Sequence, residues 1–295
     1  MSLNPSGAQY QISGGRHAAV VTEVGATLRS LTFEGRELLW TFPADGKPAH
    51  GQGKQLLPWP NRIADGRYEF DGVTQQLAIT EIDRKTALHG LNNGFAWELV
   101  SHDEGSVVQR HTFYPQSGWP GLLTVTITHS ISDDGLVVDV VAVNDGASPA
   151  PYGYGVHPYF EFGELENVTL RLPFASELDV DPDRLLPVAV GGISASMDFR
   201  EARLIGGTAF DTAFCHPTAS DWEVELRSDS HGVVVWSNAS MPWVQVFTTR
   251  PDRHAIAVEP MTCGPDAFNE GPTHDGVIVL APGASTTARW GARGI

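Results

Sequence analysis

The sequence predicts an all-β protein, a large antiparallel β-sandwich, from its strand-like alternation, its turn signals and its lack of long helical patterns. Apolar residues recur at every second position in several segments, as in strands with one buried face. Asp-Gly and Asn-Gly pairs separate these segments, and such pairs favour hairpin turns. No segment keeps a 3.6-residue apolar period over three turns. Regularly spaced strands without intervening helices are typical of sheets packed face to face.

Two kinds of strand are expected along the chain. The segments 122–132 (LLTVTITHSIS) and 222–227 (WEVELR) alternate strictly, which predicts one buried and one exposed face. The segments 135–143, 232–237 and 276–283 are nearly all apolar, which predicts strands covered on both faces. The one helix candidate, 194–205 (SASMDFREARLI), is short and fits a loop equally well. No long Pro-, Gly- or Ser-rich linker, repeat or low-complexity tract divides the chain, so we expect a single domain, 1–295.

Charge and cysteine content narrow the function classes. The chain has 35 acidic and 19 basic residues, a net charge of -16, which repels phosphate backbones and anionic membranes. We therefore expect a small-molecule substrate, no nucleic-acid or membrane partner, and a monomer or homodimer. The two cysteines, Cys215 and Cys263, are too few for a disulfide framework and predict free thiols in the cytoplasm. No secretory signal is visible at the N-terminus.

Several familiar catalytic motifs are missing from the sequence. It contains no G-x-S-x-G elbow, no phosphate loop and no H-E-x-x-H zinc motif. The stretch GYGVHP has the first two glycines of a dinucleotide fingerprint but lacks the third. We expect neither a cofactor nor a metal.

The remaining candidates are polar residues framed by aromatic or small ones. His157 lies in YGYGVHPYF (152–160), either satisfied at a bend or poised as a proton donor beside a ring-shaped ligand. Asn61 and Arg62 follow a tryptophan between two prolines. These prolines stiffen the backbone, so Arg62 either projects in a fixed direction or caps loop carbonyls. His89 precedes a glycine in TALHG, as a turn histidine or a ligand contact.

Two carboxylates complete the set. Asp211 stands between phenylalanines in FDTAF and needs a hydrogen-bond partner if it is buried, either a ligand hydroxyl or the protein itself. Glu259 ends the apolar stretch AIAVEP. An acid at a strand end beside a turn is either exposed or displayed at the mouth of a sandwich.

Five stretches, taken together, resemble the aldose 1-epimerase (galactose mutarotase-like) family. They are NRIADGRYEFDG, LHG, HPYF, DFREARLIGGTAFDTAF and EPMTCGPDAFN, in the family's order and followed by LAPGASTTARW. The resemblance implies a large antiparallel sandwich with a sugar-binding cleft and a monosaccharide substrate. It implies that His157 is the general acid at the ring oxygen and Glu259 the general base at the anomeric hydroxyl. His89 would hydrogen-bond near the ring oxygen, and Arg62 with Asp211 would hold hydroxyls, beside Asn61.

This chemistry needs only one acid and one base. The aldose loses the proton on O1 while its ring oxygen gains one, and the ring opens to an aldehyde. Rotation about the C1–C2 bond and reclosure give the other anomer. Each positioned proton transfer contributes on the order of 10² to 10⁴ in rate.

Departures from the family pattern lie beside the expected site. Val156 replaces an asparagine, Leu91 replaces a second glycine after HG, and Pro260-Met261 replaces Thr-Gln. The pattern is closer to a bacterial side branch whose sugar is neither galactose nor glucose, for example an acidic sugar such as sulfoquinovose. The alternatives are a hexose-6-phosphate epimerase, a non-catalytic sugar-binding protein, or a glycoside hydrolase that uses Glu259 with Asp211.

Overall fold

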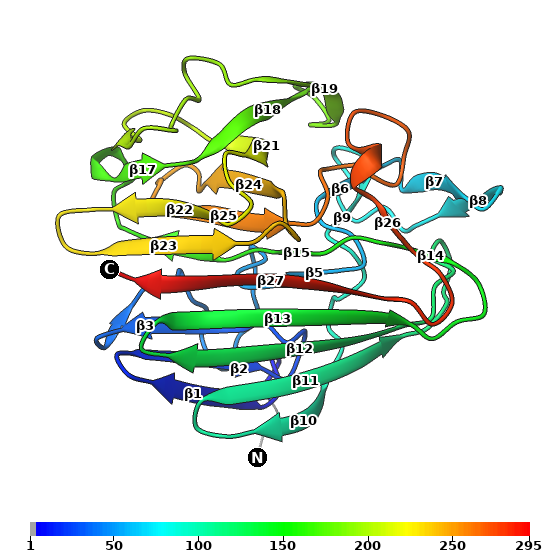
Figure 1. Ribbon diagram of the computed structural model, residues 1–295, viewed down its shortest axis with the longest axis horizontal. Coiled ribbons are helices and arrows are strands. Elements are labelled where there is room, and N and C mark those ends of the chain that lie inside the picture. Colours follow the sequence, from blue (N-terminus) through cyan, green and yellow to red (C-terminus); the bar gives the residue numbers. More distant parts are fainter. Residues whose placement is uncertain (1–3) are drawn as a thin grey trace.

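The computed structural model describes residues 4–295 and is built from antiparallel β-sheets (Figure 1). The longest sheet has nine strands in the order β10-β11-β12-β13-β27-β23-β22-β17-β20. These strands are β10 (Glu98–His102), β11 (Ser106–Phe113), β12 (Leu123–Ser132), β13 (Gly135–Asn144), β17 (Thr169–Arg171), β20 (Arg203–Leu204), β22 (Trp222–Arg227), β23 (Gly232–Ser237) and β27 (Ser285–Gly294).

An eight-stranded sheet carries the functional residues described below. Its order is β19-β18-β21-β24-β25-β15-β5, with β16 paired to β25. The strands are β5 (Gln55–Leu56), β15 (Gly155–Val156), β16 (Tyr159–Glu161), β18 (Phe174–Val180), β19 (Pro187–Gly192), β21 (Asp211–Pro217), β24 (Trp243–Thr248) and β25 (Ala255–Met261).

The remaining elements are smaller. A four-stranded sheet consists of β1 (Gln9–Gly14), β2 (His17–Thr22), β3 (Leu28–Phe33) and β4 (Arg36–Glu37). The strand pairs are β6 (Arg62–Ala64) with β9 (Thr86–Leu88), β7 (Arg67–Phe70) with β8 (Val73–Gln76), and β14 (Ala150–Tyr152) with β26 (Ile278–Leu280). Two single turns of 3₁₀ helix are η1 (Leu165–Asn167) and η2 (His274–Gly276). No helix within residues 4–295 is long and apolar enough to cross a bilayer.

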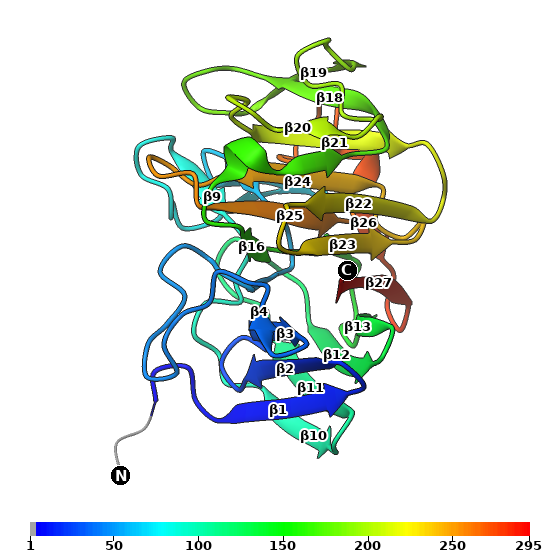
Figure 2. The same cartoon turned by 90° about the vertical axis from the view of Figure 1, so that its left-hand side faces the viewer.

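The nine-stranded sheet packs against both other large sheets (Figures 1 and 2). Strand β2 contacts β12 and β13, and β25 contacts β23. One continuous apolar cluster joins the three sheets and includes Leu31, Ile127, Val235 and Val258. Burial of such side chains stabilises the fold by about 1.5–3 kcal/mol each. The antiparallel sandwich predicted from the sequence is therefore confirmed.

The strictly alternating segments form the strands expected of them. In β12, Leu123, Val125, Ile127 and His129 are buried, while the intervening residues are half-exposed. The prediction that the continuous apolar segments are covered on both faces holds for β23 but is wrong for β13 and β26. Val141 is 38% exposed, because no other layer of residues 4–295 covers this outer face of the sheet.

Turn and helix expectations had mixed outcomes. The pair Asp71-Gly72 closes the β7–β8 hairpin with positive φ at both residues, and Gly135 begins the strand after the β12–β13 turn. Asn93-Gly94 does not close a hairpin, because it lies between β9 and β10, which pair with other strands. The segment 194–205 is a loop that ends in the short strand β20 rather than a helix.

Candidate active site

Three adjacent strands present polar side chains on one face of the eight-stranded sheet. Asp211 begins β21, Gln245 lies in β24 and Glu259 lies in β25. Gln245 is directly opposite Glu259 in the ladder. Because successive side chains of a strand alternate between faces, neighbours such as Val246 and Val258 point into the main core instead. The apolar alternation therefore fixes which way the polar residues face.

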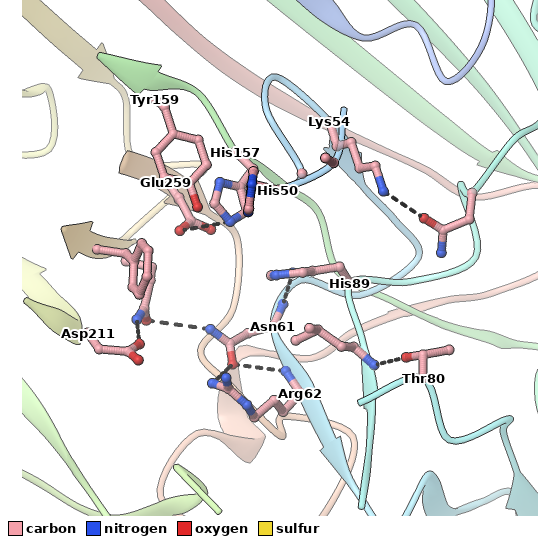
Figure 3. A pocket seen from close by; sticks show the side chains of 16 residues that line it. His50, Lys54, Asn61, Arg62, Thr80, His89, His157, Tyr159, Asp211 and Glu259 are labelled. Atoms are coloured by element: carbon pink, nitrogen blue, oxygen red, sulfur yellow. Dashed lines mark hydrogen bonds and ion pairs between the residues drawn. The ribbon is translucent and has the colours of Figure 1, made fainter. Parts of the chain in front are cut away.

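A cavity of about 490 Å³ lies over this polar face (Figure 3), a size typical of small-ligand sites. All six residues singled out in the sequence line it: Asn61, Arg62, His89, His157, Asp211 and Glu259. The sequence reasoning missed most of the others, which include His50, Lys54, Thr80, Gln245 and Phe247. None of these lies in a stretch with a recognisable motif. Tyr159, considered only as a flat apolar surface, also lines the cavity.

His157 and Glu259 lie side by side among the side chains that line the cavity (Figure 3). His157 Nε2 is 3.4 Å from Glu259 Oε1, and the Glu259 side chain is only 2% exposed. The second carboxylate oxygen, Oε2, is buried and has no hydrogen-bond partner among residues 4–295. A buried acceptor without a donor is costly, so Glu259 has hydrogen-bonding capacity that the protein itself does not use.

The backbone and ring of His157 are held from several sides. The backbone N–H of His157 donates to the backbone carbonyl of Lys54 at 3.0 Å, and the backbone carbonyl of His157 accepts from the backbone N–H of Gly53 at 2.8 Å. The imidazole stacks on the Tyr159 ring, with centroids 4.8 Å apart. The aromatic stretch around His157 thus fixes its ring beside the carboxylate.

Burial dominates the electrostatics of this pair. Desolvation lowers the pKa of His157 to about 3. Desolvation, and then the negative charge of Asp211, raise the pKa of Glu259 well above its ordinary value. Both shifts disfavour the charged forms, so burial favours a neutral imidazole and a protonated carboxyl group.

His89 is fixed as a neutral hydrogen-bond donor. Its Nδ1 accepts from the backbone N–H of Asn61 at 3.2 Å, which places the hydrogen of the neutral ring on Nε2. Burial, followed by the nearby His157, lowers the pKa of His89 well below its ordinary value. Both Asn61 and His89 have left-handed backbone conformations, with φ of 55° and 61°. Such strain in non-glycine residues is often retained at functional sites.

Two glycines allow the surrounding loops to approach the sheet. Gly53 and Gly90 have φ of 65° and 74°. A Cβ atom would lie 1.9 Å from the carbonyl oxygen of Leu28 at Gly53 and 2.1 Å from that of Leu57 at Gly90. Only glycine tolerates both the conformation and the close backbone contact. The glycine in LHG therefore helps to bring His89 to the cavity.

The opposite side of the cavity holds a cation and a carboxylate. Arg62 makes two contacts to Glu81, Nε to Oε2 at 2.8 Å and Nη2 to Oε1 at 3.0 Å, so its main partner is a side chain rather than loop carbonyls. Asp211 accepts from Gln245 Nε2 at 3.1 Å. Burial raises the pKa of Asp211, an effect that Arg62 opposes.

Lys54 brings a second cation to the cavity. Its Nζ donates to Asn93 Oδ1 at 3.2 Å, and no carboxylate within residues 4–295 forms an ion pair with it. Burial, followed by repulsion from Lys47, lowers its pKa. Both lysines line a second cavity that shares Ala49, Lys54 and Asn93 with the first.

Metal ligation is not indicated by the side-chain arrangement. Within residues 4–295, no group of three or more His, Cys, Asp or Glu side chains has the geometry of a metal site. The two cysteines are free and buried.

Comparison with known proteins places the chain in a family. The sequence model described as aldose 1-epimerase matches residues 8–292. The chain is 33% identical over 276 residues to the uncharacterized protein YihR of Escherichia coli K12, covering 92% of this chain and 89% of that protein. It is 28% identical over 227 residues to the aldose 1-epimerase of the same organism, covering 68% of this chain and 61% of the enzyme.

Solved structures show the same fold. A GalM/aldose epimerase homologue from Caenorhabditis elegans superimposes with a TM-score of 0.86 at 21% identity, covering 98% of both chains. Galactose 1-epimerase from Lactobacillus acidophilus superimposes with a TM-score of 0.79 at 19% identity, covering 96% of this chain and 92% of that one. The family expected from the sequence motifs is confirmed, and this chain belongs to the aldose 1-epimerase family.

Proposed function

We propose that the protein is an aldose 1-epimerase that interconverts the α and β anomers of a monosaccharide by general acid and base catalysis. The observation that carries the proposal is the contact of 3.4 Å between His157 Nε2 and Glu259 Oε1 in the buried cavity. The ring oxygen and O1 of a pyranose are both attached to C1, so they lie close together. An acid and a base that are neighbours therefore match two oxygens that are neighbours.

The reaction conserves protons overall. Glu259 takes the proton of O1 as the C1–O1 bond gains double-bond character, and His157 gives a proton to the ring oxygen as the C1–O5 bond breaks. After rotation about C1–C2, the ring oxygen attacks the other face of C1 and both protons return. His89 Nε2–H donates near the ring oxygen, while Asn61, Arg62 and Asp211 hold the other hydroxyls.

The bound sugar favours the ionised form of the catalytic pair. Without a bound sugar, burial favours a neutral His157 imidazole and a protonated Glu259 carboxyl group. A sugar O1–H donated to the Glu259 carboxylate, and a ring oxygen accepting from His157, both stabilise the charged groups. The proton that the Glu259 carboxyl group holds without a bound sugar then lies on His157, where ring opening needs it.

The pH dependence of catalysis follows from these pKa shifts. Because the pKa of His157 is lowered to about 3, a second proton reaches the pair only in strongly acidic solution. Because the pKa of Glu259 is raised, its carboxyl group loses its proton only at a pH well above the ordinary pKa of a glutamate. We therefore expect kcat/KM to show no step with a midpoint near the ordinary pKa of histidine. A tenfold change of kcat/KM centred there would indicate that an imidazole with an ordinary pKa controls the rate and contradict the assignment.

Nuclear magnetic resonance exchange spectroscopy tests the activity directly. Saturation of the α-anomeric proton transfers to the β-anomeric proton at a rate set by ring opening. Glucose, galactose and sulfoquinovose form the panel, with buffer alone as the blank. Faster exchange of at least one sugar is expected with the wild-type protein. Binding without faster exchange would support a non-catalytic sugar-binding protein instead.

Lys54 favours a sugar with an anionic substituent as a second, narrower candidate substrate class. A half-buried ammonium group without an ionic partner is costly, and an anion on the ligand would supply that partner. Lys54 lines the same cavity as His157, which we assign to the ring oxygen. An anionic group on the substituent at C5, the carbon next to the ring oxygen, would be the one to pair with Lys54. This location suits a 6-sulfo or 6-phospho sugar.

Replacing Lys54 tests this substrate class. We expect Lys54→Gln to raise KM for sulfoquinovose by about tenfold or more, because a charge-assisted hydrogen bond to the anion is lost. KM for galactose should change less than about threefold, since no anion is present. Lys47→Gln, a change of the neighbouring exposed lysine, is the matched control with a smaller expected effect. Equal increases for both sugars in Lys54→Gln would refute the anionic-group assignment.

The glycoside hydrolase alternative is less well supported than an epimerase. A glycoside hydrolase would use Glu259 and Asp211 as its carboxylate pair, whereas the group in contact with Glu259 is an imidazole.

We also propose that the chain is a single domain that acts in the cytoplasm as a monomer or homodimer.

A further inference from the structure

Glu81 forms several polar contacts next to the cavity, although it does not line the cavity itself. Besides the two contacts to Arg62, its Oε2 accepts from Thr86 Oγ1 at 2.7 Å, and Oε1 lies 3.5 Å from Arg84 Nη1. The side chains of Arg62 and Glu81 are only 12% and 17% exposed. The ion pair is therefore largely shielded from solvent. In such a shielded place the geometry of an ion pair matters more than it does at the surface.

The segment that carries Glu81 is itself anchored. The backbones of Glu81 and Thr86 bond each other in both directions, at 3.1 Å. Arg184, from the turn after β18, donates to the carbonyls of Arg84 and Lys85 at 3.0 and 3.1 Å. This carboxylate is thus held in place by contacts other than Arg62.

The contacts of Glu81 leave the two cavity cations in different states. Glu81 accepts two of the five N–H groups of Arg62, and Asn61 Oδ1 lies 3.4 Å from Nη1. Glu81 is the carboxylate partner of Arg62 and is shared with Arg84 at 3.5 Å, so it offsets part of the positive charge here. The N–H groups of Arg62 that have no partner stay available to hydroxyl oxygens. Lys54, in contrast, has no ionic partner within residues 4–295.

We propose that Glu81 is a specificity-determining residue that makes the Arg62 side of the cavity bind neutral hydroxyls and exclude anionic groups. It acts by holding the Arg62 guanidinium in a close ion pair, without touching the sugar. An anionic substituent is therefore favoured on the side of the cavity that contains Lys54. The identity of the ligand as a sugar rests on the proposed function, but the exclusion of anions does not.

The pKa of Glu81 agrees with this arrangement. Burial alone would raise it, but hydrogen bonds from Arg62 and then Thr86 lower it below the ordinary value. Glu81 is therefore ionised at neutral pH, where its charge opposes that of Arg62.

Binding of inorganic sulfate, measured by isothermal titration calorimetry, tests the exclusion without any assay of activity. The Lys54→Gln variant serves as the parent, so that Lys54 does not contribute a site. Adding Glu81→Gln should strengthen sulfate binding at least about tenfold, because Arg62 then has no carboxylate partner. Further addition of Arg62→Gln should abolish the gain. Equal sulfate affinity in the parent and the Glu81→Gln variant would overturn the proposal.

Two controls separate the local effect from changes in net charge or folding. Glu98→Gln removes the same charge from an exposed pair with Arg110 and should leave sulfate affinity unchanged. Glu81→Asp keeps a negative charge beside Arg62, so it should gain no sulfate affinity. A gain in either control would overturn the proposal, because the effect would not depend on the charge of Glu81. Thermal melts of every variant verify that the proteins compared are folded.

Anomer exchange of galactose then gives a second readout. In Glu81→Gln, with Lys54 intact, we expect KM to rise several-fold while kcat changes less than about threefold, because binding of hydroxyls is weakened and the proton transfers are not. If wild type shows no exchange, the proposed function fails, but the sulfate result still decides the role of Glu81. A fall in kcat with unchanged KM would contradict the binding role.

Discussion

Glu259→Gln is expected to lower kcat for anomer exchange by about 10² to 10⁴, the contribution of one positioned proton transfer. The amide has nearly the same size as the carboxyl group and still accepts a hydrogen bond from O1–H, but it does not take the proton. KM should change little, because the ground-state contacts persist. Exchange spectroscopy on the best sugar of the panel measures both constants. A loss of less than about fivefold would exclude Glu259 as the base.

The same substitution separates chemistry from stability. Glu259 is buried, and its pKa in the folded protein is raised, so the folded state holds the proton more tightly than the unfolded state. The stability that this group contributes therefore falls as the pH rises above the pKa of Glu259 in the unfolded state. Glutamine carries no charge at any pH, so the Tm of Glu259→Gln at pH 7 should equal or exceed that of wild type. A lower Tm would contradict this reading of the Glu259 pKa.

His157→Gln is expected to lower kcat by a similar factor of about 10² to 10⁴. Glutamine retains a hydrogen-bond donor for the ring oxygen but has no proton to give, so ring opening loses its acid. The Tyr159 ring, which stacks on the imidazole, also loses a partner, and a modest fall in Tm is expected. The decisive measurement is kcat, because packing alone would not change it by two orders of magnitude.

His50→Gln is the matched control for that change. His50 lines the same cavity (Figure 3), but it is exposed and makes no contact to Glu259 among those described. Its replacement should alter kcat less than about threefold. Equal losses in His50→Gln and His157→Gln would show that kcat responds to any change of a histidine in the cavity, rather than to the loss of one particular acid.

The strands that face one layer of core were predictable, because alternation reports burial directly. Leu123 to Ile131 show this clearly, with each apolar residue packed inward. The outer face of β13 was not predictable, because its valines resemble core residues while they lie on an outer face of the sheet. Local composition gives no information about which face another layer covers.

The site was predictable only where a motif carried it. The order of five short stretches in the sequence singled out six candidate residues, and all six line one cavity. Lys54, Gln245 and Glu81 were missed, because their importance depends on partners that are 39, 34 and 19 positions away. Contacts of that kind arise from strand order and loop packing, and no local pattern records them.

A double-substitution cycle of anomer exchange rates most directly tests the claim that His157 and Glu259 act as one catalytic pair. Wild type, Glu259→Gln, His157→Gln and the double variant are compared on the same sugar. The account predicts fast exchange in wild type, similar losses in the two single variants, and little further loss in the double variant, because either change stops the coupled proton transfer. Losses that add independently, or no exchange in wild type, would contradict it.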